Sequence, residues 1–276
     1  MQKPKVSFFR RADTNMTEGG IARHLVTFAA PLLLGFIFQQ LYNTVDSIVV
    51  GNFVGKEALA AVGSVGPIIN TLIGFFLGLA AGASVVISQY YGARDGKSVH
   101  EAVHTTVVMT FIMCVLFTVA GVLMVPAMLR LMSTPDDVFE GAVQYLRIYF
   151  YGVSGLMVYN MGAGVLRAVG DSRRPLYFLI FSAVVNTVLD LVFVIVFDWG
   201  ITGVAAATVV SQCLSAVLVL MVLTRSEGSY RIIWRFLKIN KVMLRKIWKI
   251  GLPSALQQAV TSFSNVFVQS YINHDM

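Results

Sequence analysis

The sequence predicts an all-α polytopic membrane protein, and three observations carry that prediction. Of the 276 residues, 57% are hydrophobic and only 13% are charged, whereas soluble domains contain roughly 45 to 50% and 25% of these classes. Charge-poor stretches as long as a transmembrane helix, which needs about 20 residues, recur along the chain. Cationic residues are concentrated in alternate connections between these stretches, which is the pattern of cytoplasmic loops.

Seven such stretches cover residues 25–50, 63–90, 103–129, 143–166, 176–197, 201–223 and 250–273. When the connections are assigned alternately to the two sides, one side receives every Lys and Arg except Lys56, Arg130 and Arg147. The positive-inside rule places that side in the cytoplasm. We therefore predict a multi-pass protein of the cytoplasmic (plasma, or cell inner) membrane, with its N-terminus in the cytoplasm and its C-terminus outside.

Proline and glycine within the spans predict how the helices bend and meet. Pro31, early in the first span, removes a backbone hydrogen bond and favours a kink, which is either a conformational hinge or a tolerated irregularity. In the second span a small residue occurs at every fourth position, at Gly74, Gly78 and Gly82. This spacing lets a neighbouring helix approach closely, so we predict a packing role for these glycines.

A basic segment, residues 225–249, separates the sixth and seventh stretches and is interleaved with apolar residues. We expect it on the cytoplasmic membrane surface; a solvated connector and a partner-binding segment are the alternatives. Beyond it, Pro253 and Asn265 repeat the spacing of Pro31 and Asn43 in the first span. This weak internal repeat predicts a six-helix lobe over residues 1–224, a segment between lobes over 225–249, and the first helix of a second lobe over 250–276.

Acidic side chains inside the apolar spans are the strongest functional signal. Only Asp46 and Asp190 lie well within a span, where desolvation makes a carboxylate costly. Asn186 precedes Asp190 by one helical turn, so the two share a helix face. Counting from the external hairpin puts Asp190 and Thr208 at a similar depth, with Asp46 nearer the external surface and Asn160 toward mid-membrane. We expect a polar pocket in the outer half of the bundle.

Such a cluster of carboxylates, carboxamides and a hydroxyl has few uses inside a membrane. It can carry a proton, because an apolar environment favours the protonated carboxyl, or it can bind a small hard cation such as sodium through oxygen ligands. The alternative is that these groups only hydrogen-bond between helices, which stabilises a bundle by about 0.6 kcal/mol for each pair. The desolvation cost of two acids is larger than that gain, so we predict a function for them.

Several stretches resemble one known family. They read FAAPLLLG at 28–35, QQLYNTVD at 39–46, GNFVGKEALAAVG at 51–63, QYYGARD at 89–95, GVLRAVGDSRRP at 164–175 and GLPS at 251–254. In this order they are similar to the MATE (multidrug and toxic compound extrusion) exporters, closest to the DinF-like bacterial branch. The resemblance runs through essentially the whole chain.

The resemblance implies twelve helices in two six-helix lobes that alternate between outward-facing and inward-facing states. It also implies a proton or sodium site formed by Asp46, Asn160, Asn186, Asp190 and Thr208, none of which is substituted here. Sodium, if bound, would lie at Asp46, Asn186 and Asp190, and Pro31 corresponds to the proline whose bending is linked to protonation. Since this chain ends after the seventh span, we expect an incomplete twelve-helix fold.

The function that the resemblance implies is cation-coupled antiport, with export of small organic, often amphipathic, drugs or toxic compounds. We expect no enzymatic activity, no cofactor apart from the coupling proton or Na⁺, and no nucleic-acid partner; the partners would be the substrate, the bilayer and the missing second lobe. A lipid-linked oligosaccharide flippase, an intramembrane aspartyl protease and a seven-helix receptor are the alternatives. A flippase should have a basic cavity, and neither Asp46 nor Asp190 stands in the Gly-x-Gly-Asp motif of the proteases.

Overall fold

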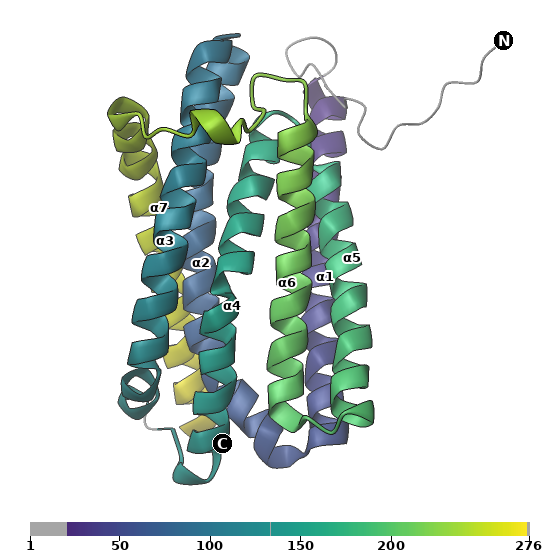
Figure 1. Ribbon diagram of the computed structural model, residues 1–276. Coiled ribbons are helices and arrows are strands. Elements are labelled where there is room, and N and C mark those ends of the chain that lie inside the picture. The colour runs from purple at the N-terminus through teal and green to yellow at the C-terminus, as the bar shows by residue number, and fades with distance from the viewer. Residues whose placement is uncertain (1–20, 133, 275–276) are drawn as a thin grey trace, which may run out of the picture.

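The computed structural model describes residues 21–132 and 134–274, and these form seven long α-helices (Figure 1). No strand occurs among the described residues, so the predicted all-α class is confirmed. The helices are α1 (Ile21–Val49), α2 (Lys56–Gly92), α3 (Gly96–Leu131), α4 (Asp136–Ala168), α5 (Arg173–Leu191), α6 (Gly200–Arg225) and α7 (Lys241–His274).

Five of these helices, α1, α2, α3, α5 and α6, are both long enough and apolar enough to cross a membrane. The other two, α4 and α7, are 33 and 34 residues long, but their described residues do not meet the same test of apolarity. α4 contacts α2, α3 and α6, and a helix surrounded by other helices exposes fewer side chains to lipid. α7 carries a cluster of Lys and Arg in its first turns, where they would reach headgroups rather than acyl chains.

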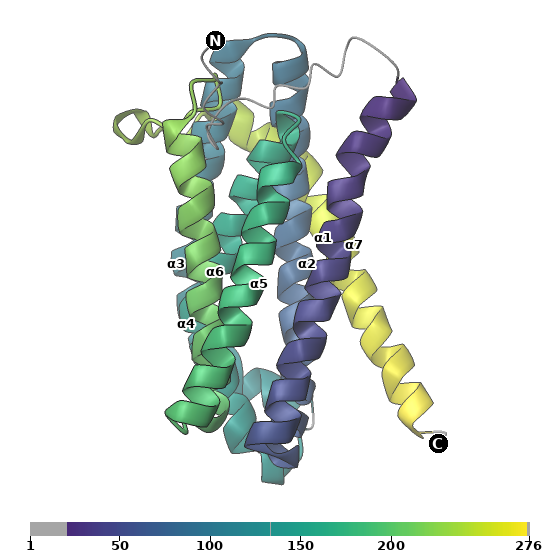
Figure 2. The ribbon, with the colours of Figure 1, turned by 90° about the vertical axis from the view of Figure 1, so that its right-hand side faces the viewer.

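The helices pack in a fixed order around α4 (Figures 1 and 2). α7 packs on α2 and α2 on α4, while α4 packs on α6, α6 on α5, and α5 on α1; α3 covers α2 and α4. One buried cluster includes Ile87, Val103 and Leu166, and a second includes Phe76 and Phe150 nearer the opposite end. α1 therefore lies at one edge of the bundle, and α7 lies at the other.

The glycine face of α2 packs directly against α7. A Cβ atom added to Gly78 would overlap the backbone of Ala255, and one added to Gly82 would overlap the Cα of Gly251. A Cβ atom added to Gly74 would lie 3.3 Å from the hydroxyl oxygen of Ser262. The predicted packing role of the three glycines is confirmed, because only a residue without a side chain permits this approach.

α7 begins at Lys241, so the predicted start at residue 250 is wrong. The cause is a cap: the Asn240 Oδ1 accepts hydrogen bonds from the backbone N–H groups of Val242, at 2.8 Å, and Met243, at 3.3 Å. Asparagine is a favoured N-cap because it satisfies N–H groups that have no partner inside the helix. The basic residues 241–249 are therefore helical, and only residues 226–240 form the connection from α6.

We predict that Gly78→Ala destabilises the protein by about 1 to 3 kcal/mol, the usual cost of overpacking. The added methyl group must push α7 away from α2, because the overlapping atoms of Ala255 are backbone. Denaturant titration in mixed micelles would measure the free energy of unfolding. Gly63→Ala is the matched control on the same helix, since a Cβ there meets no atom within 4 Å; equal stabilities of the two variants would contradict the prediction.

Candidate functional site

Asp190 and Asn186 are buried between α5 and α6, with exposed fractions of 0% and 1%. With the Asn186 amide oriented to satisfy both neighbours, its Nδ2 donates to Asp190 Oδ2 at 3.1 Å and its Oδ1 accepts from the Thr208 backbone N–H at 3.2 Å. The Thr208 hydroxyl lies 3.5 Å from the same amide group. The four-residue spacing on α5 thus places an amide where it holds the carboxyl group against α6.

α1 brings Asp46 to the same place. The Asp46 and Asp190 carboxyl groups lie within hydrogen-bonding reach of each other, although the sequence predicts that Asp46 lies nearer the external surface. The depth estimate is wrong because the first helix does not end at residue 50: it continues through a π-helical turn, η1 (Val50–Val54). Asp46 therefore lies about two turns from the end of its span, much as Asp190 does.

A second π-helical turn, η2 (Val192–Val196), follows α5 directly after Asp190. The two π turns contact each other, so both acid-bearing helices end in the same irregular structure at the same side of the bundle. Such turns are rare and occur frequently at functional sites. Composition gives no signal for them, since η1 reads VGNFV and η2 reads VFVIV, much like the apolar helices that precede them.

One oxygen of each carboxyl group is buried without a hydrogen-bond partner among the described residues: Oδ1 of Asp46 and Oδ1 of Asp190. An unsatisfied carboxylate oxygen inside an apolar bundle is costly. Both atoms are acceptors that a proton or a small cation would satisfy. The arrangement is therefore chemically suited to binding one positive charge.

Two other predicted residues, Asn160 and Pro31, do not belong to the hydrogen-bonded group around the two carboxyl groups. The Asn160 side chain is buried on α4, and its Nδ2 donates to the Leu156 carbonyl of its own helix at 2.9 Å. No hydrogen bond in the described part of the chain joins it to the two carboxyl groups. Pro31 lies inside α1, which remains helical on both sides of it.

Three buried serines extend the polar contacts away from Thr208 toward the other end of the bundle. Ser211 Oγ donates to the Thr208 carbonyl at 2.9 Å, Ser182 Oγ donates to the Ser211 carbonyl at 2.9 Å, and Ser215 Oγ donates to the same carbonyl at 3.3 Å. These serines were not among the predicted site residues. The available signal was their helical spacing: Ser182 is four residues from Asn186, Ser211 is three from Thr208, and Ser215 is four from Ser211.

We predict that Asn186→Ala lowers the free energy of unfolding by about 1 to 3 kcal/mol, because the Asp190 Oδ2 and the Thr208 N–H would both lose a partner. Asn70→Ala, at an exposed position on α2, is the control and should change the free energy of unfolding little. Denaturant titration in mixed micelles would measure the free energy of unfolding of both variants. A fully stable Asn186→Ala variant would show that this amide does not hold the carboxyl group.

Membrane-spanning helices that bury two carboxyl groups beside amide and hydroxyl groups are typical of a transporter that handles ions. The MatE family model matches residues 31–192. The chain belongs to the MatE family, so the resemblance to MATE exporters is confirmed. These proteins are multi-pass membrane transporters and not enzymes, which rules out the protease alternative.

Individual relatives agree with this assignment. The chain is 35% identical to the "Probable multidrug resistance protein YoeA" of Bacillus subtilis (strain 168), over 94% of this chain and 57% of that protein. A MATE family transporter solved in an outward-facing conformation has 28% identity and a TM-score of 0.87, with 94% of this chain and 58% of that chain covered. A MATE family transporter solved in an inward-facing conformation has 28% identity and a TM-score of 0.75, with 86% of this chain and 55% of that chain covered.

This chain thus spans a little over half the length of the relatives it matches. Its helices are arranged more like the outward-facing transporter than like the inward-facing one, since the TM-score falls from 0.87 to 0.75 between them. The match to the outward-facing transporter covers 94% of this chain, so it extends into α7 beyond the first six helices.

Proposed function

We propose that this chain forms the cation-binding part of an antiporter that exports small organic compounds across the cytoplasmic membrane. The observation that carries the proposal is the meeting of Asp46 and Asp190 between α1 and α5. Membership of the MatE family and the name of the Bacillus relative support drug-like substrates. The charge distribution supports an N-terminus in the cytoplasm.

The coupling ion that this geometry favours is a proton. Two carboxyl groups within hydrogen-bonding reach repel each other when both are ionised, and they attract each other when one proton lies between them. Sodium is the alternative, with Asp46, Asn186 and Asp190 supplying oxygen ligands. In that case the Asn186 amide would have to turn, because its Nδ2 and not its Oδ1 faces Asp190 here.

Binding of the cation would be transmitted through α1. This helix packs against α5 and continues into η1, and only 6% of its apolar stretch is buried, compared with 50% for α2. Few contacts therefore hold α1 in place besides those near Asp46. Neutralising the carboxyl pair would change how α1 sits on α5, with Pro31 as the point of bending, and the bound substrate would be released outward.

A flippase for lipid-linked sugars would need cationic side chains facing the transport pathway to bind a diphosphate. The charged groups brought together here are carboxyl groups instead. The exporter is therefore the better supported of the two transporter functions.

We expect Asp190→Asn to abolish coupled export, because an amide cannot release and rebind a proton. Everted membrane vesicles from cells that express this chain together with a second lobe, with ethidium as the organic cation, would show antiport as proton movement on substrate addition. Asp198→Asn is the matched control on the same hairpin: Asp198 is exposed and has a φ of 53°, which asparagine also tolerates. Coupling at the wild-type level in Asp190→Asn would refute the proposal.

The same vesicles distinguish the two coupling ions. An imposed pH gradient without sodium should drive ethidium transport, whereas a sodium gradient at equal pH on both sides should not. The reverse result would assign sodium to the site and leave the role of the carboxyl pair intact.

We further expect Pro31→Ala to slow transport, because the added N–H restores a backbone hydrogen bond and stiffens α1 at the proposed hinge. The initial rate of ethidium transport at equal protein level is the measurement. Pro126→Ala, which makes the same change inside α3, should leave the rate close to that of the wild type. Equal rates for both variants would remove Pro31 from the mechanism.

A further inference from the structure

The connector between α6 and α7, residues 226–240, is fastened to α3 by a buried histidine. The exposed fraction of His104 is 2%. Its Nδ1 lies 2.8 Å from the His100 carbonyl, to which it donates, so its Nε2 is free to accept from the Ile233 backbone N–H at 3.1 Å. A connector joined only at its ends would not need such a contact. This one is held near its middle.

A second attachment lies at the end of the connector. The Asn240 backbone N–H donates to Thr105 Oγ1 at 3.0 Å, and its side-chain Nδ2 donates to Glu101 Oε2 at 2.7 Å. The same asparagine caps α7 with its Oδ1. α3 therefore fixes both the path of the connector and the point where α7 begins, and the connector has a defined outer face.

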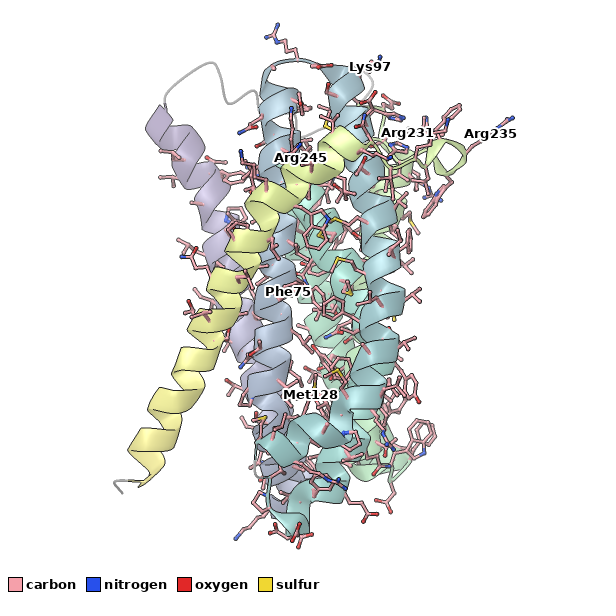
Figure 3. All side chains as sticks on the ribbon, turned by 90° about the vertical axis from the view of Figure 1, so that its left-hand side faces the viewer. Phe75, Lys97, Met128, Arg231, Arg235 and Arg245 are labelled. Carbon is pink, nitrogen blue, oxygen red and sulfur yellow. The ribbon has the colours of Figure 1, made fainter. Side chains whose placement is uncertain are left out.

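That outer face combines cations with large apolar side chains. Trp234 and Phe236 are exposed by 50% and 57%, and Arg235, Lys238 and Lys241 are exposed beside them. Figure 3 shows Arg235 extending away from the helices at the end of the bundle where α7 begins. Exposed aromatic residues interleaved with cations are typical of a surface that meets the membrane interface.

The depth of this face along the bundle is set by Trp234. Its ring centroid lies 6.1 Å from that of Phe111 on α3. Phe111 is the first of a line of exposed apolar residues along α3 that continues with Ile112, Val115, Leu116, Val119 and Leu123. Such a line is the lipid-facing side of a membrane helix, so Trp234 lies where the acyl chains begin and the neighbouring cations lie at headgroup level.

We propose that residues 234–241 form a preorganised site for anionic phospholipid headgroups. Arg235, Lys238 and Lys241 would contact lipid phosphates, while Trp234 and Phe236 insert at the interface. The attachment of the connector to α3 reduces the ordering cost of binding, because the chain already has its bound shape. An anionic lipid thereby holds the start of α7, the helix that packs on α2, at a fixed depth. The site is independent of the carboxyl pair and of the exported substrate.

Quenching of Trp234 fluorescence by brominated lipids tests the proposal directly. The chain has three tryptophans, and Trp199→Phe with Trp248→Phe leaves Trp234 as the reporter. The full chain would be placed in nanodiscs that contain either brominated phosphatidylglycerol in unlabelled phosphatidylcholine or the reverse. We expect brominated phosphatidylglycerol to be enriched beside Trp234 by about fivefold or more, the effect of a few cations near an anionic leaflet.

The reporter variant that also carries Arg235→Gln, Lys238→Gln and Lys241→Gln should show no enrichment, so the ratio of phosphatidylglycerol beside Trp234 to that in the bulk lipid should fall to about one. High salt should lower it as well. Lys56→Gln, Arg130→Gln and Arg147→Gln are the matched control: they remove the same charge from exposed positions at the opposite end of the bundle, so the enrichment should remain. Thermal unfolding in detergent would establish that both triple variants are folded.

Three outcomes would overturn the proposal. Equal quenching by the two lipids would reduce the segment to a nonspecific interfacial anchor. Quenching by neither lipid would show that solvent or a protein covers Trp234. Enrichment that survives loss of the three cations would assign lipid selectivity to another part of the chain.

Discussion

A carboxyl group removed from water needs a partner, and in this protein two carboxyl groups are partners for each other. Asp46 and Asp190 come from helices far apart in the sequence, yet their side chains lie within hydrogen-bonding reach. A pair of this kind is stable inside an apolar bundle only while something positive is shared between them. Under the proposed function, the position of α1 relative to α5 would therefore be tied to the charge state of the site.

The other helices around the site, α2 to α6, are packed closely against one another, whereas α1 is not. α5 is held to α6 by Asn186, and α6 is held to α4 by glycines that bring the two helices into close contact, notably Gly155 beside the backbone of Cys213. α4 is in turn packed against α2 and α3. The glycine of α1 makes no comparable contact: a Cβ added to Gly35 would meet only leucine side chains of α5, at 3.8 Å and beyond. A change at the carboxyl pair thus acts on the least restrained helix.

Much of this architecture was predictable from the sequence because membranes impose simple rules. Span positions follow from length and apolarity, and the glycine spacing of α2 correctly predicted a close helix contact. Errors arose where a local interaction overrides the apolar pattern. Asn240 starts α7 within a basic segment that composition marks as non-helical, and the π turn after α1 lowers Asp46 to the level of Asp190. Neither a cap nor a π turn leaves a periodic signal.

The candidate site shows the same division. The four-residue spacing of Asn186 and Asp190 predicted their shared face, and counting from the external hairpin put Thr208 at the level of Asp190; the structure places the three side chains together. Counting put Asn160 toward mid-membrane and the family resemblance assigned it to the site, but its amide donates to its own helix here. Ser182, Ser211 and Ser215 were overlooked, because a hydroxyl in a membrane helix ordinarily bonds to the preceding turn and is common in such sequences.

The contact between Gly82 and Gly251 also constrains how the protein is assembled in the membrane. α2 is synthesised long before α7, so lipid must cover the glycine face of α2 until α7 is inserted. Because the two backbones approach too closely for any side chain at Gly82, α7 has to displace that lipid completely in a late step of biogenesis. A chain interrupted within the connector would leave the glycine face of α2 open to any other membrane helix with small residues.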